Sequence, residues 1–290
     1  MTTKENTTGT TVIDKMKAGA LRTKEQIVKI MDENGNGEID LEDIVIKGLK
    51  TPGIAINRDQ FLRRQFLKNY PESVVAKAVS ESPMKANIPL REVNRIADDV
   101  IRFERNCVSG ISAALSTPGG IAMAATIPAD VLQYYGYLMR VTQKLLYLYG
   151  FPQIDVQEKG SKFDDGTMNT LILCFGVMYG VVGANNAVKA MSKALAKGVS
   201  KQLIKKALTK GTIYPIVKSV AKWFGIKMTK QIFTKFFEKS IPIAGGIIGG
   251  GITYLSFKPC CDKLKATLQD TVLSNPDYKS DPDEEEIIIE

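Results

Sequence analysis

Three long stretches without a charged side chain limit what this chain can fold into. They cover residues 106–129, 166–188 and 240–257, and are 24, 23 and 18 residues long. About 20 apolar residues are enough to cross a bilayer, so such stretches indicate either helices buried in a compact core or a hairpin inserted in a membrane. Serines, asparagines and a Pro-Gly-Gly break interrupt them, and the mean hydropathy of the chain is −0.06. We therefore expect buried helices.

Apolar residues recur every three or four positions along much of the chain, which predicts helices. The clearest case is 130–149, followed by Gly150 where a left-handed C-terminal cap is expected. No stretch alternates apolar and polar residues over the length of a strand. Further helices are expected at residues 13–31, 44–49, 58–69, 71–81, 89–105 and 258–273. The predicted fold is all-α, with a multi-helix Gly/Ala-rich core and a small N-terminal helix-loop-helix region.

Changes in composition divide the sequence into three parts. Residues 1–90 form an N-terminal helical region that contains a calcium-type loop at residues 32–43, and residues 91–273 form the helical core. Residues 274–290 carry a run of acidic side chains and are expected to be a disordered tail.

The loop at residues 32–43 has the spacing of oxygen ligands found in calcium-binding loops. Calcium takes about six to eight oxygen ligands, and Gly37 permits the sharp turn that wraps the chain around the ion. The ligand positions are occupied by Asp32, Asn34, Asn36, Glu38 through its backbone carbonyl, Asp40 and Asp43. The sequence therefore predicts a calcium site, at which magnesium competes.

The last ligand position departs from the common EF-hand loop. Asp43 stands where a glutamate usually binds the ion through both oxygens, and its side chain is one methylene shorter. In this respect the loop is similar to those of dockerin modules, which use two loops where this chain has one. Weak affinity, on the order of 10⁻⁵ M, is expected. The alternative is an Asn/Gly-rich turn between two helices that binds no metal.

Positive charge is concentrated between Asn185 and Ser240, where thirteen lysines and no arginine accompany a single acid, Glu238. Five of these lysines are spaced by four residues, which predicts one ridge along a helix: Lys189, Lys193, Lys197, Lys201 and Lys205. A basic amphipathic helix can lie on an anionic membrane or bind an acidic partner. A solvated helix face is the alternative. Nucleic acid is not expected, because arginine is missing and aromatic residues are not interleaved with the ridge.

The chain contains no histidine, which excludes Ser-His-Asp and Cys-His mechanisms and histidine metal sites. Its four cysteines, at positions 107, 174, 260 and 261, form no C-x-x-C pair. Free thiols in a reducing compartment are the simplest interpretation, and no signal-peptide pattern is present, so a cytoplasmic location is expected. An enzyme here would have to use carboxylates, lysine, tyrosine or a thiol, and we expect a non-enzymatic protein.

Glycines and prolines recur at expected helix junctions, in the segments 118–120, 127–130, 149–150, 241–246 and 249–250, and Arg140 lies within the long predicted helix. Over roughly residues 95–270 this pattern resembles the EcsC protein family. The resemblance implies an association with a transporter system but no defined activity or catalytic residues. Asp130 is most simply a carboxylate at a helix N-terminus, with a functional pairing to Arg140 as the minor alternative.

Three hypotheses about function follow from the sequence. The first is a non-enzymatic protein that acts at the inner face of a membrane, either on the anionic lipid surface or on a membrane protein. The second is a soluble interaction module that responds to calcium. The third, and least favoured, is an enzyme that uses carboxylates or a thiol. The sequence carries no evidence on the oligomeric state.

Overall fold

The computed structural model describes residues 29, 32, 33, 35, 37, 40–115, 123–154, 164–224, 245–279, 287 and 289. These residues include helices and no strand, which confirms the predicted all-α fold. The helices with defined bounds are α2 (Leu41–Lys50), α3 (Arg58–Phe66), α4 (Glu72–Ser80), α5 (Leu90–Leu115), α6 (Met123–Leu148), α7 (Asp165–Tyr179), α8 (Ala184–Ala196), α9 (Lys201–Thr209) and α11 (Gly245–Gln269). Residues 214–224 are also helical.

Local sequence signals set where several helices begin. Asp40 caps α2, while Pro71 and Pro89 stand immediately before α4 and α5. Two helices are longer than the periodicity predicts: α5 continues from the expected end at residue 105 to 115, and α6 begins at 123 instead of 130. Pro128 therefore lies inside α6, whereas proline more often precedes a helix or stands in its first turn. The predicted helix at residues 13–31 lies outside the described residues except for Lys29.

The expected cap at Gly150 is present. Gly150 has φ of +89°, and Phe151 N–H donates to the carbonyl of Leu146 at 2.9 Å, which is the bond of a Schellman motif. A Cβ atom at position 150 would lie 3.0 Å from the carbonyl oxygen of Leu273. Glycine is therefore required twice, for the backbone angle and for the approach of the segment that follows α11.

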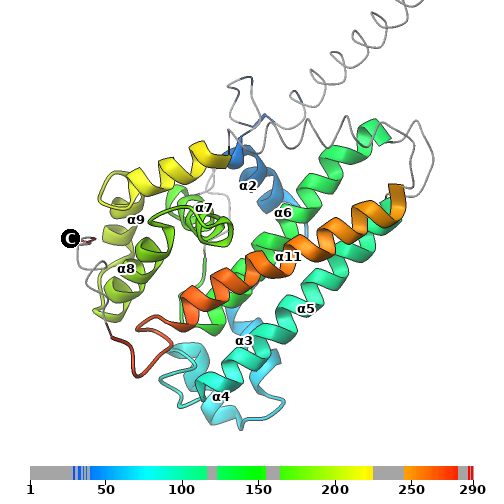
Figure 1. Ribbon diagram of the computed structural model, residues 1–290. Helices are drawn as coiled ribbons and strands as arrows, with labels where there is room; N and C mark the ends of the chain where they lie inside the picture. The colour runs from blue at the N-terminus through cyan, green and yellow to red at the C-terminus, as the bar shows by residue number, and fades with distance from the viewer. Residues whose placement is uncertain are drawn as a thin grey trace, which may run out of the picture.

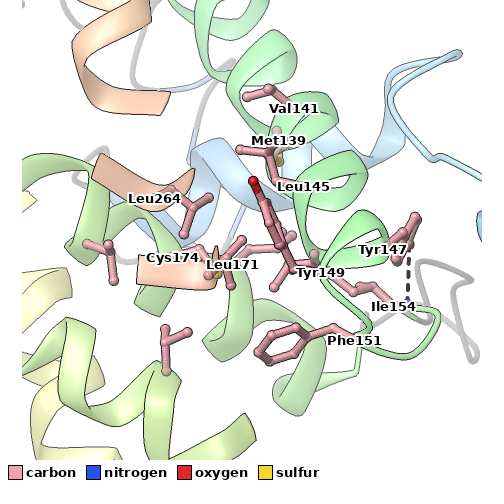
Figure 2. Packing of buried hydrophobic residues seen from close by; sticks show 14 of the residues in the cluster. Met139, Val141, Leu145, Tyr147, Tyr149, Phe151, Ile154, Leu171, Cys174 and Leu264 are labelled. Carbon is pink, nitrogen blue, oxygen red and sulfur yellow. Dashed lines mark hydrogen bonds between the residues drawn. The ribbon is translucent and has the colours of Figure 1, made fainter. Parts of the chain in front are cut away.

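The second half of α6 is buried on nearly all sides. The predicted stripe is buried at Leu138, Leu145 and Tyr149, but Met139 and Tyr147 between them are also inaccessible to solvent. Figure 2 shows Tyr149 on the side of Leu171 of α7 and Leu264 of α11, whereas Tyr147 lies on another side, beside Ile154. The amphipathic pattern therefore understates the burial of this helix, because neighbours cover it from several directions.

Helices α5, α6, α7 and α11 form the centre of the molecule. In Figure 1, α11 runs along α5 and crosses α6, while α8 and α9 lie on the far side of α7. The uncharged stretch 166–188 contains most of α7, in which residues 171–178 are all buried, as expected for a core helix. Among the helices described, none is long and apolar enough to cross a membrane.

The N-terminal helices share this core. Residues Leu41, Ile44 and Val45 of α2 are fully buried in the same hydrophobic cluster as α6 and α7. The extended segment between α2 and α3 is held by side chains of the core: Gln143 bonds the carbonyl of Ile54 and the N–H of Ile56, both at 3.0 Å. The expected boundary at residue 90 therefore does not separate two hydrophobic cores.

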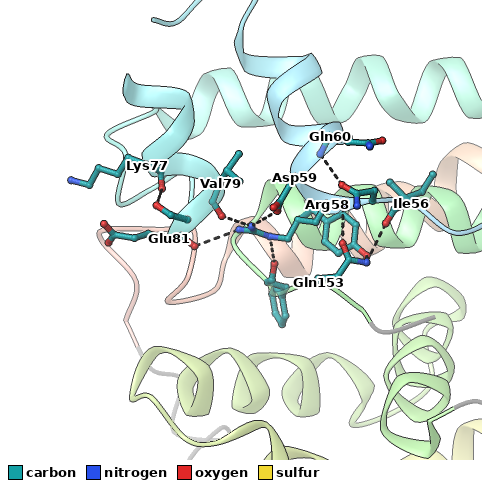
Figure 3. Close-up of polar contacts among 12 residues, drawn as sticks. Ile56, Arg58, Asp59, Gln60, Lys77, Val79, Glu81 and Gln153 are labelled. Atoms are coloured by element: carbon teal, nitrogen blue, oxygen red, sulfur yellow. Dashed lines mark hydrogen bonds and ion pairs between the residues drawn. The ribbon is translucent and has the colours of Figure 1, made fainter. Parts of the chain in front are cut away.

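A buried arginine fastens α3 to two other segments (Figure 3). Arg58 is 6% exposed, and its guanidinium donates to the carbonyls of Phe151 at 3.1 Å, Val79 at 2.5 Å and Glu81 at 3.4 Å. Burial lowers the pKa of Arg58, and the nearby carboxylate of Asp59 opposes that shift. Arg58 thus ties the end of α4 and the segment after α6 to the start of α3.

The segment after α11 is packed at its beginning. Thr271 and Ser274 are buried, and the Ser274 hydroxyl donates to the carbonyl of Leu268 at 2.7 Å. Ile287 and Ile289 are partly buried against the hydrophobic core. The tail expected from residue 274 onward is therefore anchored at these positions, and the acidic run 281–286 lies outside the described residues.

Candidate functional site

The predicted lysine ridge does not lie on one helix, so that prediction is wrong. Helix α8 ends at Ala196, Gly198 adopts φ of +76°, and α9 begins at Lys201 with Ser200 as its cap. Val199 N–H donates to the carbonyl of Ala194 at 2.9 Å, which closes the end of α8. The five lysines are therefore divided between two helices that are separated by a turn.

Three of the five predicted lysines are engaged within the molecule. Lys189 forms an ion pair with Asp270 at 2.8 Å and its side chain is only 16% exposed, and Lys193 stands over the ring of Tyr278. Lys205 pairs with Asp164, the residue that caps α7. Lys197 and Lys201 are exposed, and no ion pair is found for either within the described residues.

The prediction considered only lysines spaced by four residues, and it left out other lysines that are better placed to bind an external partner. Residues 184–224, here called the basic segment, contain nine lysines and no aspartate or glutamate. Lys206, Lys210, Lys218 and Lys222 are exposed, and in the described structure none of them forms an ion pair. The signal that could have found them is the absence of acids along the whole segment, since a lysine without a nearby carboxylate keeps its charge available.

The calcium-type loop is described at Asp32, Asp40 and Asp43, whereas Asn34, Asn36 and Glu38 lie outside the described residues. The Asp32 carboxylate accepts from the N–H groups of Gly35 at 2.6 Å and Gly37 at 2.8 Å. These bonds fold the chain back toward the first ligand position.

Asp43 has a structural role at the other end of the loop. It is fully buried, and its two oxygens accept from Glu33 N–H at 2.8 Å and Asp40 N–H at 2.9 Å. The Asp40 side chain accepts in return from Asp43 N–H at 3.0 Å, so the two residues form a capping box at the start of α2. Among the described residues, no group of three or more acidic or cysteine side chains is arranged to hold a metal ion.

Negative charge accumulates where α2 begins beside the start of α7. Burial raises the pKa of Glu42, and the charges of Asp40, Asp43 and Asp165 raise it further. Nearby, Glu33 is bound by Lys47 and by Lys50, both at 2.8 Å, and these bonds hold its pKa below the usual value. Several carboxylates therefore gather in an acidic patch at the end of the loop, together with Lys47 and Lys50.

A fully buried carboxylate joins α5 to α6, and it was not among the predicted site residues. Glu104 of α5 accepts from Arg140 Nε at 3.1 Å and Nη2 at 3.3 Å, and it also pairs with Lys144. The third donor of Arg140, Nη1, reaches the carbonyl of Gly53. The sequence signal for such a partner was the presence of two cations, Arg140 and Lys144, four residues apart on α6. Like charges on one buried face need an acidic partner. The Asp130 side chain is not among those described.

Three tyrosines cluster between α6, α7 and α11. The Tyr134 hydroxyl lies 3.4 Å from Ser256 Oγ, and the rings of Tyr134 and Tyr135 meet edge to face with centroids 5.5 Å apart. Burial raises the pKa of Tyr134, Tyr135 and Tyr179, to about 12 for Tyr135. These hydroxyls therefore stay neutral and supply no base at neutral pH.

The buried thiols are poorly suited to nucleophilic chemistry. Burial raises the pKa of Cys174 to about 12 and also raises the pKa of Cys260 and Cys261. The reactive form of cysteine is the thiolate, which these environments disfavour. The thiol-enzyme hypothesis therefore gains no support at these three positions.

No protein-family model, curated protein or solved structure matches the chain.

Proposed function

We propose that the basic segment holds this protein at an anionic membrane surface, without a catalytic role. The observation that supports the proposal is the charge of residues 184–224, where nine lysines occur without a single acid. An anionic bilayer attracts each nearby lysine by about 1 kcal/mol at physiological ionic strength. Several exposed lysines acting together are sufficient for reversible binding.

Some lysines of the basic segment are paired within the molecule and others are exposed, and the exposed ones are expected to carry the interaction. Lys189 and Lys205 would have to exchange an intramolecular carboxylate for a lipid headgroup, which reduces their net contribution. Lys201, Lys206, Lys210 and Lys222 are exposed and have no such exchange to make with any described carboxylate. The proposal therefore moves the contact from the original ridge to α9 and the helical residues 214–224.

Vesicle sedimentation tests this proposal. The variant with Lys201, Lys206, Lys210 and Lys222 changed to Gln should lose about a hundredfold or more in affinity for vesicles rich in phosphatidylserine. Binding of the unchanged protein should also weaken as salt rises, because exposed charges are screened.

The matched control removes the same charge from the other end of the molecule. Changing Arg64, Lys68, Lys77 and Lys85 to Gln removes four exposed cations from the region of α3 and α4. This control should lose far less affinity than the basic-segment variant. Equal losses, or equal binding of the unchanged protein to neutral and anionic vesicles, would contradict the proposal.

We also propose that the chain is related to the EcsC family. Such a relation is compatible with a place at the inner face of a membrane, since the family is associated with a transporter system. Arg140, one of the residues that carry the resemblance, binds Glu104. We assign Arg140 a structural role and no catalytic one.

Calcium binding at the loop is a second proposal, supported by the acidic patch. The nearby carboxylates of Asp40, Asp43 and Asp165 help to raise the pKa of Glu42, and a divalent cation bound there would oppose that effect. Isothermal titration should find one calcium ion per chain, no binding for Asp32→Ala, and tighter binding for Asp43→Glu, with magnesium as a competitor. If the unchanged protein takes up no calcium at about millimolar concentration, the loop is only a turn.

A further inference from the structure

The turn between α7 and α8 exposes an apolar side chain to an unusual degree. Val182 is 94% exposed, the most of any large hydrophobic residue described. It follows Val181 in a Gly-Val-Val-Gly turn whose two glycines, Gly180 and Gly183, have φ of +73° and +82°. Turns of this kind normally carry polar residues such as Asn, Asp or Ser. Two β-branched apolar residues at this position need an explanation that turn formation does not provide.

Partly exposed apolar residues lie near this turn. A Cβ atom at Gly183 would lie 3.6 Å from the side chain of Ile216, so the turn rests against the helical residues 214–224. Trp223 in the same helix is half-buried, and its ring centroid is 5.7 Å from that of Tyr179 at the end of α7. We call Val182, Ile216 and Trp223 the apolar tip.

Two lysines lie beside this tip. Lys222 is exposed about 100° around the helix from Trp223, and Lys263 of α11 places its Nζ 3.6 Å from the Cβ position of Gly180. An apolar projection with a basic rim matches the boundary between anionic headgroups and acyl chains. Tryptophan favours the same depth in a bilayer.

We propose that the apolar tip inserts into the headgroup region of an anionic bilayer, with Val182 deepest. This inference rests on the proposed membrane function and adds to it a contact that salt does not screen. A bilayer suits the tip better than a protein partner, because the tip is a small projection with a basic rim and presents little apolar area for a protein interface.

The native tryptophan provides a direct measurement. Trp223 is the only tryptophan in the chain, so its fluorescence reports on the tip without any added label. Vesicles with bromine atoms on the upper part of the acyl chains should quench Trp223 more strongly than vesicles brominated near the chain ends. Absence of any quenching in protein that is fully bound to vesicles would overturn the proposal.

Variants at Val182 test the contact independently of tryptophan. Val182→Thr keeps the shape of the side chain but replaces an apolar methyl by a hydroxyl, and it should lower vesicle affinity about fivefold, whereas Val182→Asp should lower it at least tenfold. The control is Leu67→Asp, which adds the same charge at a 48% exposed residue beyond α3 and should have little effect. Affinity that is unchanged in both Val182 variants overturns the proposal.

The outcomes separate this inference from the function on which it rests. If the lysine variant loses vesicle binding and the Val182 variants do not, the contact is purely electrostatic and only the tip proposal fails. If no vesicle binding occurs at all, both fail. If Val182→Asp instead dissociates a dimer seen by analytical ultracentrifugation and leaves vesicle binding intact, the tip binds a second copy of the chain and the lipid proposal is overturned.

Discussion

The two halves of this molecule use positive charge in different ways. All arginines except Arg22 lie between residues 58 and 140, and none follows Arg140. In that part, Arg58 binds three carbonyls, Arg95 binds Glu92 and Asp99, and Arg140 binds Glu104. The basic segment 184–224 has only lysines and no acid of its own.

This difference matches the chemistry of the two side chains. The planar guanidinium offers several donors in a fixed geometry, which suits defined contacts inside a protein, whereas the lysine ammonium is a strongly hydrated point charge on a flexible chain. We infer that charge serves internal structure in the first region and remains available for an external partner in the second. The predictions below test that division.

The largest effect on stability is expected from the buried carboxylate. Glu104→Ala leaves Arg140 and Lys144, whose side chains are 23% and 12% exposed, without their shared partner. Breaking a buried ion pair in this way should lower the free energy of unfolding by about 3 kcal/mol. Chemical denaturation measures the change.

An exposed pair provides the control for Glu104. Glu72→Ala breaks an ion pair with Arg63 in which the two side chains are 62% and 42% exposed, and it should cost less than about 1 kcal/mol. A similar loss for both variants would mean that burial does not determine the contribution of these pairs.

An intermediate effect is expected from exchanging the two kinds of cation. Arg58→Lys cannot maintain donation to three separate carbonyls and should cost about 2 kcal/mol. Lys206→Arg, at an exposed position of α9, should change the free energy of unfolding by less than about 0.5 kcal/mol. Thermal and chemical denaturation of the two variants check the prediction, and equal effects would remove the distinction between the regions.

The smallest effect concerns Glu42 in the acidic patch. Burial, with Asp40, Asp43 and Asp165, raises its pKa in the folded state above the unfolded value. Its ionised form therefore destabilises the fold at neutral pH, and this cost disappears as the pH falls through the raised pKa and below the unfolded value of about 4.3. Glu42 is solvent-exposed and its charge is screened, so Glu42→Gln should raise the Tm at pH 7 by less than about 1 °C and leave it unchanged at acid pH. A lower Tm at pH 7 would contradict the sign.

Local signals made part of this fold predictable. Asp40, Pro71 and Pro89 identify the starts of three helices, and Gly150 identifies the end of a fourth, because capping and proline geometry depend on a few neighbouring residues. The division of the lysine ridge at Gly198 could also have been read from sequence, since glycine followed by serine two residues later commonly ends one helix and starts the next.

Other features depend on contacts between distant segments, which spacing along the chain does not report. Glu104 meets Arg140 and Lys144 only because α5 and α6 pack together. The candidate membrane contact likewise combines Val182 with Ile216 from different helices. Of the predicted calcium ligands, the structure describes Asp32, Asp40 and Asp43, of which the last two already act as a helix cap.

The placement of α11 has a consequence for how the protein is made. Its main neighbour, α5, ends at residue 115, yet α11 begins only at residue 245. A ribosome adds about 5–20 residues per second, so α5 spends on the order of ten seconds without the helix that covers it. During that time its apolar face is open to chaperones and to other nascent chains. Chains that stop before residue 245 retain that exposure, which makes truncated products of this protein strong candidates for aggregation and degradation.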